Sequence, residues 1–211
     1  MAATRPAVLV LARHPDFGPV KTRLAADVGA AEARRIYAAL AARVWEGLAD
    51  PAWERWLWVT PAAACAATAD WLPGADRVEA QPDGDLGARL AAAVAAACAE
   101  PRPWVAVVGT DAPDVDAALL RGAAVRLRPE GGEADAVVVP AEDGGYAALL
   151  LATPAPELFR DVPWGGPEVL AVTRRRATAA GLVLAETAPV RDLDTAADLA
   201  WFRARARDAR H

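Results

Sequence analysis

Residues 104–111 read Trp-Val-Ala-Val-Val-Gly-Thr-Asp, a short apolar run that ends on a glycine and a carboxylate. A valine-rich run of this length, closed by turn residues, is typical of a strand buried on both faces of a parallel sheet. Similar runs recur along the chain, separated by longer alanine-, leucine- and arginine-rich stretches with helical spacing. The alternation predicts an α/β fold, a Rossmann-like three-layer sandwich around a mainly parallel mixed sheet.

Seven strands and six helices are expected, with no repeat or low-complexity linker between them. The strands are predicted over 7–12, 56–60, 77–81, 104–108, 136–139, 146–151 and 182–185. The helices are predicted over 30–48, 62–71, 86–99, 115–127, 168–180 and 195–206, with Asp194 or Thr195 as the cap of the last. We therefore expect residues 1–211 to form a single domain.

Composition narrows the classes of partner. The 28 acidic and 23 basic residues give a formal charge of −5, which argues against a dedicated nucleic-acid binder. Apolar residues make up 55% of the chain, enough for a sizeable core, but no run approaches the ~20 apolar residues of a membrane span. The first apolar run, 8–11, is too short for a signal peptide. We expect a cytoplasmic protein that binds neither nucleic acid nor a membrane.

Absent residue types narrow the chemistry. The chain has no serine, which excludes a Ser-His-Asp hydrolase. Cys65 and Cys98 are far apart in alanine-rich stretches and have no metal-binding spacing. Arginine occurs 22 times but lysine only once, at Lys21. A lysine retained in this background is a candidate for a task that needs a compact charge, such as binding phosphate.

The loop after the first predicted strand is rich in cations. Arg13, Lys21 and Arg23 fall within eleven residues that lead toward a helix. Backbone N–H groups, a helix N-terminus and these charges together suit a diphosphate, although the loop lacks the glycines of a Walker A motif. The alternative is a solvated basic loop without a ligand.

Two acidic segments also follow predicted strands. Asp111 ends the run quoted above, and Asp192 and Asp194 lie before the last helix. Mg²⁺ or Mn²⁺ bound beside a diphosphate takes one or two protein carboxylates, so Asp111 with Asp192 or Asp194 is a candidate metal site. The remaining carboxylate of that pair would cap the last helix. Asp111 could instead cap the helix that follows it.

A third loop, 142–146, reads Glu-Asp-Gly-Gly-Tyr between two predicted strands. It could be a simple hairpin turn. Alternatively, Asp143 lies beside the reacting centre as a ligand of the acceptor or as a general base, with Gly144, Gly145 and Tyr146 around the substrate. Trp164, between a proline and two glycines, could stack on a sugar or base.

The segment 81–90 reads Gln-Pro-Asp-Gly-Asp-Leu-Gly-Ala-Arg-Leu. Asp85 and Arg89 are four residues apart and would share one helix face, either as a surface ion pair that caps the helix or as part of a site. In the second case Gln81 and Arg89 would contact the nucleotide.

Taken in order, the motifs GPVKTRL, QPDGDLGARL, GTDAPD, EDGGY, PWGG and DLDTAADL resemble a bacterial family of small GT-A-like glycosyltransferases. These are relatives of the nucleotidylyltransferases of molybdenum-cofactor and deazaflavin-cofactor synthesis. The resemblance spans nearly the whole chain and implies a GT-A fold. It implies that Lys21 and Arg23 hold a nucleotide diphosphate, Asp111 a metal ion, and residues 81–89 the nucleotide. Asp143 and Tyr146 would border the sugar or the acceptor.

The sequence thus predicts a transferase that depends on Mg²⁺ or Mn²⁺ and moves a sugar from a nucleotide sugar to a small-molecule acceptor. Lys21 would help to neutralise the leaving diphosphate, and Asp143 would deprotonate the acceptor if the reaction inverts. Two alternatives remain open. One is a nucleotidylyltransferase that joins an NTP to a phosphorylated small molecule, and the other is a nucleotide-binding module without catalysis.

Overall fold

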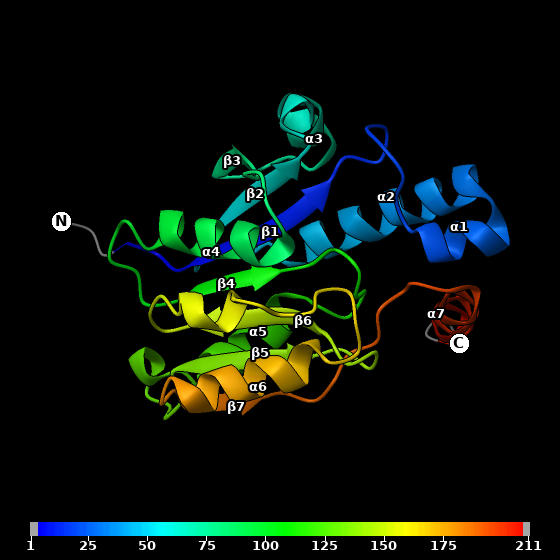
Figure 1. The fold of residues 1–211 in the computed structure, drawn as a ribbon. Coiled ribbons are helices and arrows are strands. Elements are labelled where there is room, and N and C mark those ends of the chain that lie inside the picture. The colour runs from blue at the N-terminus through cyan, green and yellow to red at the C-terminus, as the bar shows by residue number, and fades with distance from the viewer. Residues whose placement is uncertain (1–3, 209–211) are drawn as a thin grey trace.

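The sheet of the protein has seven strands in the order β3-β2-β1-β4-β6-β5-β7 in the computed structural model, which describes residues 4–208 (Figure 1). The strands are β1 (Ala7–Arg13), β2 (Glu54–Thr60), β3 (Arg77–Ala80), β4 (Val105–Val108), β5 (Ala136–Pro140), β6 (Tyr146–Leu151) and β7 (Leu184–Glu186). Strand β6 runs antiparallel to β4 and β5, and every other pairing between strands is parallel. The predicted mainly parallel mixed sheet is confirmed.

Seven α-helices connect the strands. They are α1 (Thr22–Val28), α2 (Ala30–Gly47), α3 (Cys65–Trp71), α4 (Leu86–Ala97), α5 (Ala117–Ala124), α6 (Val169–Ala179) and α7 (Ala196–Asp208). The six predicted helices are present, with ends that differ by at most three residues, and 62–64 forms a 3₁₀ turn before α3. Helix α1 was not predicted, because its seven residues are too few to show a helical repeat. No helix within residues 4–208 is long and apolar enough to cross a membrane.

The helices cover both faces of the sheet and so make the three predicted layers (Figure 1). Alternate residues of β1 show this directly: Val8 and Val10 belong to the core that contains α2 and α5, and Leu9 belongs to the core that contains α4 and α6. Strand β4 alternates in the same way. Burial on both faces explains why these strands read as continuous apolar runs in the sequence.

The carboxyl ends of the parallel strands meet at one edge of the sheet. Strand β1 lies between β2 and β4, so the connection after β1 runs toward β2 and the connection after β4 runs in the opposite direction, toward β5. Ligands of open α/β sheets bind where the connections diverge in this way. Because β6 is antiparallel, the turn that joins β5 to β6 also lies at this edge.

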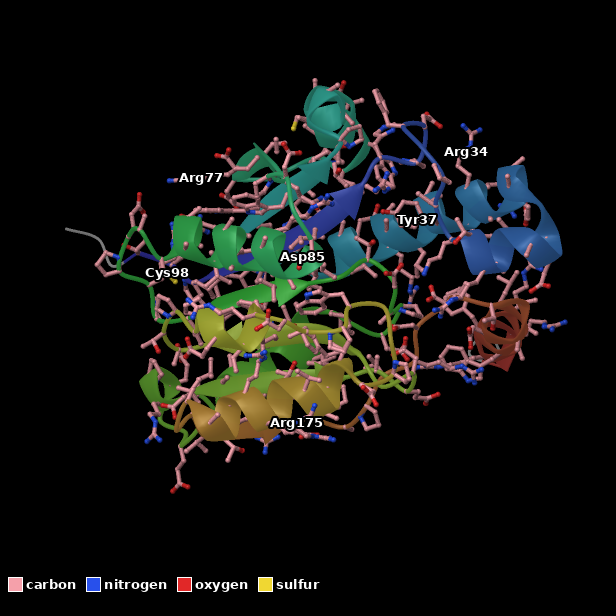
Figure 2. All side chains as sticks on the ribbon, viewed as in Figure 1. Arg34, Tyr37, Arg77, Asp85, Cys98 and Arg175 are labelled. Atoms are coloured by element: carbon pink, nitrogen blue, oxygen red, sulfur yellow. The ribbon has the colours of Figure 1, made fainter. Side chains whose placement is uncertain are left out.

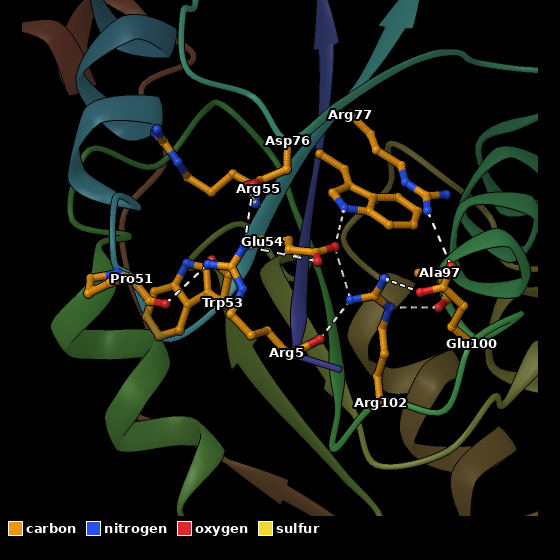
Figure 3. Close-up of polar contacts among 11 residues, drawn as sticks. Arg5, Pro51, Trp53, Glu54, Arg55, Asp76, Arg77, Ala97, Glu100 and Arg102 are labelled. Atoms are coloured by element: carbon orange, nitrogen blue, oxygen red, sulfur yellow. Dashed lines mark hydrogen bonds and ion pairs between the residues drawn. The ribbon is translucent and has the colours of Figure 1, made fainter. Parts of the chain in front are cut away.

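The opposite edge is held by a buried polar network around Arg102 (Figure 3). Its side chain is only 1% exposed and lies 3.0 Å from a Glu54 carboxylate oxygen. The guanidinium also donates to the carbonyl oxygens of Arg5 at 2.6 Å and Ala97 at 3.0 Å. Arg102 therefore ties the N-terminal segment to the starts of β2 and β4.

Arg102→Met should lower the free energy of unfolding by about 3 kcal/mol, because it leaves Glu54 and two carbonyl groups without their buried partner. Thermal denaturation measures this as a fall in Tm of roughly 6–12 °C. The control is Glu100→Gln, which removes an exposed partner of the same arginine and should change stability by at most about 1 kcal/mol. An equal loss in both variants would contradict the role given to the buried network.

Candidate functional site

Lys21 is the centre of the candidate site. Its ammonium nitrogen lies 2.5 Å from Oδ1 of Asp111 and 2.6 Å from Oδ1 of Asp194. The lysine side chain is 3% exposed, whereas Asp111 is half exposed and Asp194 about a third. One buried cation thus joins the loops that follow β1, β4 and β7.

The charges of the two carboxylates keep Lys21 protonated. Burial by itself lowers the pKa of the lysine, but the Coulombic and hydrogen-bond interactions with Asp111 and Asp194 outweigh burial and raise the pKa above its ordinary value. Lys21 also has a left-handed backbone conformation, with φ 48° and ψ 50°, directly before α1. The strained backbone places the side chain between the two carboxylates.

Asp192 lies close to the same cluster but without a partner. Its Oδ1 is buried and makes no hydrogen bond with any of the described residues. Burial and the neighbouring charges of Asp111, Asp143 and Asp194 raise the pKa of Asp192 to about 7. The carboxyl group is therefore poised to accept a cation or a hydrogen-bond donor.

The last helix does not use either aspartate as its cap. Thr195 Oγ1 accepts a hydrogen bond from the Asp198 N–H at 3.3 Å, and Asp198 Oδ2 accepts one from the Thr195 N–H at 2.9 Å. This reciprocal capping box confirms Thr195, rather than Asp194, as the cap. The expectation that one member of the pair Asp192 and Asp194 caps the helix is wrong, and both carboxylates remain near Asp111.

Asp111 does not cap the next helix either. Helix α5 is capped by Asp116, whose Oδ1 accepts a hydrogen bond from the Leu119 N–H at 2.8 Å. The Asp111 backbone carbonyl accepts a hydrogen bond from the Leu193 N–H at 2.9 Å. This bond holds the segment after β7 against the end of β4, so the acidic loops lie side by side.

A cavity of about 330 Å³ opens on one side of Asp111, and we call it the basic cavity. It contains Arg13 and Lys21, both predicted to bind phosphate. Its lining comprises Leu11, Ala12, Arg13, Pro19, Val20, Lys21, Thr22, Tyr37, Thr60, Gln81, Leu86, Thr110 and Asp111. Arg23 lies outside this lining, is 65% exposed and comes within 4.0 Å of Asp194.

Tyr37 of α2 organises the basic cavity and was missed in the sequence analysis. Its hydroxyl donates to the Arg13 carbonyl oxygen at 2.9 Å and accepts from the Arg13 N–H at 3.1 Å and from Thr110 Oγ1 at 3.4 Å. Burial raises the pKa of Tyr37. The only sequence signal was a tyrosine on the apolar stripe of a helix, which more often indicates core packing.

Gln81 lines the same cavity, whereas Arg89 lies outside the lining and contacts Gln81, and both side chains are engaged within the protein. The Gln81 amide donates to the Trp58 carbonyl oxygen at 2.8 Å, and Arg89 donates to Gln81 Oε1 at 3.4 Å and to the Gly84 carbonyl oxygen at 3.1 Å. Asp85 caps α4 by accepting from the Ala88 N–H at 2.8 Å. Within residues 4–208, Arg89 forms no ion pair with Asp85, so the helix cap is confirmed and the expected surface ion pair is wrong. Figure 2 labels Asp85 on α4 and Tyr37 on α2.

A second cavity, of about 210 Å³, lies on the other side of Asp111, and we call it the acidic cavity. Asp111, Asp143 and Asp192 all contribute to it. The complete lining comprises Leu11, Leu86, Leu90, Val107, Val108, Gly109, Asp111, Asp143, Gly145, Tyr146, Ala147, Trp164, Gly165, Gly166, Val169 and Asp192. The structure thus gathers Asp143, Gly145, Tyr146 and Trp164 around one cavity, whereas Gly144 lies outside its lining.

The turn at 143–146 is both a hairpin turn and part of this wall. Asp143 Oδ1 accepts a hydrogen bond from the Gly145 N–H at 2.9 Å, which fixes the carboxylate. Gly144 has φ 92°, and a Cβ atom there would lie 2.1 Å from the Pro167 carbonyl oxygen. Only glycine fits this close approach, which holds the turn against the segment before α6.

Tyr146 and Trp164 form an aromatic pair in the wall of the acidic cavity. Their ring centroids are 6.1 Å apart, with an interplanar angle of 79°. The Tyr146 hydroxyl and the Trp164 Nε1 are buried and have no hydrogen-bond partner in the described part of the chain. Burial raises the pKa of Tyr146, so the hydroxyl stays protonated.

The residues at this edge fit a metal ion only when a bound ligand supplies the remaining atoms of the ion's coordination shell. Within residues 4–208, no three histidine, cysteine, aspartate or glutamate side chains are placed to hold an ion by themselves. Asp111 and Asp194 nevertheless bring two carboxylate oxygens to the same ammonium. Mg²⁺ in nucleotide enzymes commonly takes one or two carboxylates plus substrate phosphates.

Comparison with known protein families assigns the chain to one of them. Residues 44–166, more than half of its length, match the model of a family described as an uncharacterized protein conserved in bacteria, DUF2064. The chain belongs to the DUF2064 family. The matched part includes Asp111, Asp143 and Trp164, whereas Lys21 and Asp194 lie outside it. No curated protein matches the chain in sequence.

Solved structures place the DUF2064 fold among nucleotide-handling transferases. A "putative nucleotide-diphospho-sugar transferase" from Desulfovibrio desulfuricans G20 is 28% identical, with a TM-score of 0.84 over 93% of this chain and 85% of the other. The 4-diphosphocytidyl-2C-methyl-D-erythritol synthase is 10% identical, with a TM-score of 0.61 over 97% and 99%. The CMP:2-keto-3-deoxy-manno-octonic acid synthetase, solved with CTP, is 13% identical, with a TM-score of 0.58 over 98% and 100%.

These comparisons agree with the family resemblance found in the sequence. The fold is that of the nucleotide-diphospho-sugar transferases, as the motifs predicted. The two synthases share the fold at low identity. The roles assigned to individual residues stay predictions. They concern Arg13, Lys21, Arg23, Gln81, Asp85, Arg89, Asp111, Asp143, Tyr146, Trp164 and Asp194.

Asp192→Asn should stabilise the DUF2064 protein more at pH 8 than at pH 5. The pKa of this carboxyl rises from 3.8 to about 7 on folding, so the folded state bears a growing penalty as pH rises through this interval. Asparagine is uncharged and avoids the penalty. The gain in Tm over the wild type is expected to be larger at pH 8 than at pH 5 by several degrees, because about two pH units of the interval lie between pH 5 and pH 7, measured with EDTA present. The control, Asp83→Asn on the exposed loop before α4, should show no such pH-dependent difference.

Proposed function

We propose that the protein is a transferase that uses a nucleotide-activated donor with Mg²⁺ or Mn²⁺, and that the reaction is glycosyl transfer from a nucleotide sugar to a small-molecule acceptor. The observation that carries the proposal is that Asp111, which is paired with Lys21, lines two cavities of unlike character. A nucleotide diphosphate fits the basic cavity, and the group bonded to it would then extend past Asp111 into the acidic cavity.

The candidate ligands indicate which kind of metal ion the site would hold. Asp111 and Asp194 would hold the ion, with Asp192 as a further carboxylate whose Oδ1 has no partner among the described residues. A bound Mg²⁺ or Mn²⁺ supplies positive charge that neutralises the diphosphate as it leaves. All the candidate ligands are carboxylate oxygens, which these hard cations prefer.

Lys21, Arg13 and Arg23 would bind the phosphate oxygens. Lys21 already lies against two carboxylate oxygens, so its ammonium can exchange one of these partners for a phosphate oxygen with little movement. Positive charge held in place before the reaction stabilises the charge that develops on the leaving diphosphate. Tyr37 supports this arrangement because it fixes the backbone of Arg13.

Asp143 is the proposed general base of an inverting transfer. The acceptor oxygen forms a bond to the anomeric carbon while the bond from that carbon to the diphosphate oxygen breaks, and the acceptor proton passes to Asp143. The carboxylate is exposed and is oriented by the Gly145 N–H. An incoming hydroxyl group can therefore approach it at the mouth of the acidic cavity.

A second candidate is nucleotidyl transfer from an NTP to a phosphorylated small molecule. The likeness in fold to two cytidylyl-group synthases, one solved with CTP, favours it. The 28% identical neighbour, with its much higher TM-score, favours sugar transfer. The two reactions differ in their products: glycosyl transfer releases a nucleoside diphosphate, and nucleotidyl transfer releases pyrophosphate.

Nucleotide binding should be visible as a metal-dependent rise in Tm. At a ligand concentration of 100 times Kd the stabilisation is about 2.7 kcal/mol, or roughly 5–10 °C for a chain of this size. The panel contains NTPs, nucleoside diphosphates and nucleotide sugars, each with Mn²⁺ or with EDTA. The largest shift is expected with one nucleotide sugar and Mn²⁺. A larger shift with a triphosphate favours nucleotidyl transfer, and no shift with any nucleotide contradicts both reactions.

Lys21→Met should lower turnover by at least about 100-fold, because it removes positive charge beside the leaving diphosphate. Asp111→Asn should have an effect of the same size, because it removes a carboxylate that would hold the metal ion. Turnover is followed as nucleoside diphosphate released from the nucleotide sugar selected by the binding panel. The matched control is Asp114→Asn, three residues from Asp111 in the same loop and outside both cavities, which should keep full activity. Full activity in Asp111→Asn would exclude the proposed role of this site, and circular dichroism checks that the variants fold.

A further inference from the structure

The two cavities that meet at Asp111 have opposite charge. Arg13 and Lys21 contribute two cations to the basic cavity, where Asp111 is the one acidic residue of the lining. The acidic cavity contains three carboxylates, from Asp111, Asp143 and Asp192, and its lining includes no lysine, arginine or histidine. The chain therefore separates positive from negative charge within one cleft.

The rest of the acidic cavity is apolar and aromatic. Leucine and valine side chains from β1, β4, α4 and α6 form one part of the wall, and Tyr146 and Trp164 form another. At about 210 Å³ the cavity is smaller than the pockets that hold drug-sized ligands. It has room for one small ring rather than for a chain of several sugars.

Three buried polar atoms of this wall lack partners among residues 4–208: the Tyr146 hydroxyl, Trp164 Nε1 and Asp192 Oδ1. Trp164 Nε1 is a donor, Asp192 Oδ1 is an acceptor while ionised, and the Tyr146 hydroxyl can act as either. The three atoms belong to residues that line the cavity, and hydroxyl groups of a ligand, which both donate and accept, match all three in hydrogen-bonding type. A phosphate or carboxylate group on the ligand only accepts and would lie among the carboxylates of this cavity.

We propose that the acidic cavity selects an uncharged, hydroxylated ring, which is the glycosyl group of the donor, and excludes rings that carry a carboxylate or a phosphate. The proposal rests on the proposed function, since the diphosphate must lie in the basic cavity for the glycosyl group to reach this one. A divalent cation at Asp111 and Asp194 does not reverse the selection, because the Asp143 carboxylate accepts a hydrogen bond only from the Gly145 N–H and has no cationic partner among the described residues. Asp143 and Asp192 are the residues that determine this specificity.

Matched donors test the selection on the full-length protein with Mn²⁺. UDP-glucose and UDP-glucuronate differ only at C6, where the second carries a carboxylate, and GDP-mannose and GDP-mannuronate form the same pair on another base. Isothermal titration calorimetry should give a Kd at least about tenfold lower for the uncharged member of the pair that binds. UDP and GDP, which lack the ring, report on the basic cavity alone.

Two variants test which side chains cause the preference for the uncharged sugar. Asp143→Asn and Asp192→Asn should each reduce the ratio of the two Kd values at least threefold, mainly by improving binding of the uronate. Tyr146→Phe should weaken binding of the neutral sugar by about three- to tenfold without changing binding of the free nucleoside diphosphate. Because the Tyr146 hydroxyl has no partner within residues 4–208, its removal breaks no hydrogen bond of the described fold. Asp114→Asn is again the control and should leave the ratio unchanged.

The outcomes separate this inference from the proposed function. If a nucleoside diphosphate binds but the uronate binds as well as the neutral sugar, the selection is overturned and the proposed transferase stands. The same holds if neither aspartate variant changes the ratio. If no nucleotide binds with Mn²⁺, the proposed function fails and the inference falls with it. A tenfold preference that Asp143→Asn and Asp192→Asn reduce supports both.

Discussion

The contact of Lys21 with Asp111 and Asp194 is the interaction on which the site depends. It joins segments that are 90 and 173 residues apart in the chain, since the lysine follows β1, Asp111 follows β4 and Asp194 precedes α7. A residue other than glycine with φ 48° costs of order 1–3 kcal/mol, and the two ion pairs offset this cost. The same strain and the same charges hold a compact cation where a phosphate group can reach it.

The sheet topology explains why so few residues suffice for the site. Parallel strands deliver the loops after β1, β4, β5 and β7 to one edge, and the antiparallel β6 begins at that edge with Tyr146. The Asp143–Gly144–Gly145 turn is therefore close to Asp111 although it belongs to a hairpin and not to a crossover. The Arg102 network fixes the opposite edge.

The strands could be predicted because they are buried on both faces of the sheet and therefore appear in the sequence as apolar runs. Most helices could be predicted from the helical spacing of their apolar residues. Helix α1 could not, because its seven residues form only two turns before Gly29. The site was predicted loop by loop: Lys21, Asp111 and Asp194 were each assigned to a loop after a strand. Their mutual contact was not, because it depends on strand order, and the role of Tyr37 was not, because its hydroxyl bonds form only in the folded chain.

The opposite charge of the two cavities constrains how any donor can bind. A nucleotide sugar with a neutral sugar carries its negative charge on the diphosphate alone, so Arg13 and Lys21 would attract that end while Asp143 and Asp192 would repel it. Reversed binding would place phosphates against carboxylates and an uncharged ring against buried cations, and both contacts are unfavourable. Electrostatics of this kind fixes orientation more than affinity. Under the proposed function the anomeric carbon would then lie near Asp111, and Asp143, in the wall of the acidic cavity, would be on the side from which an acceptor hydroxyl group approaches.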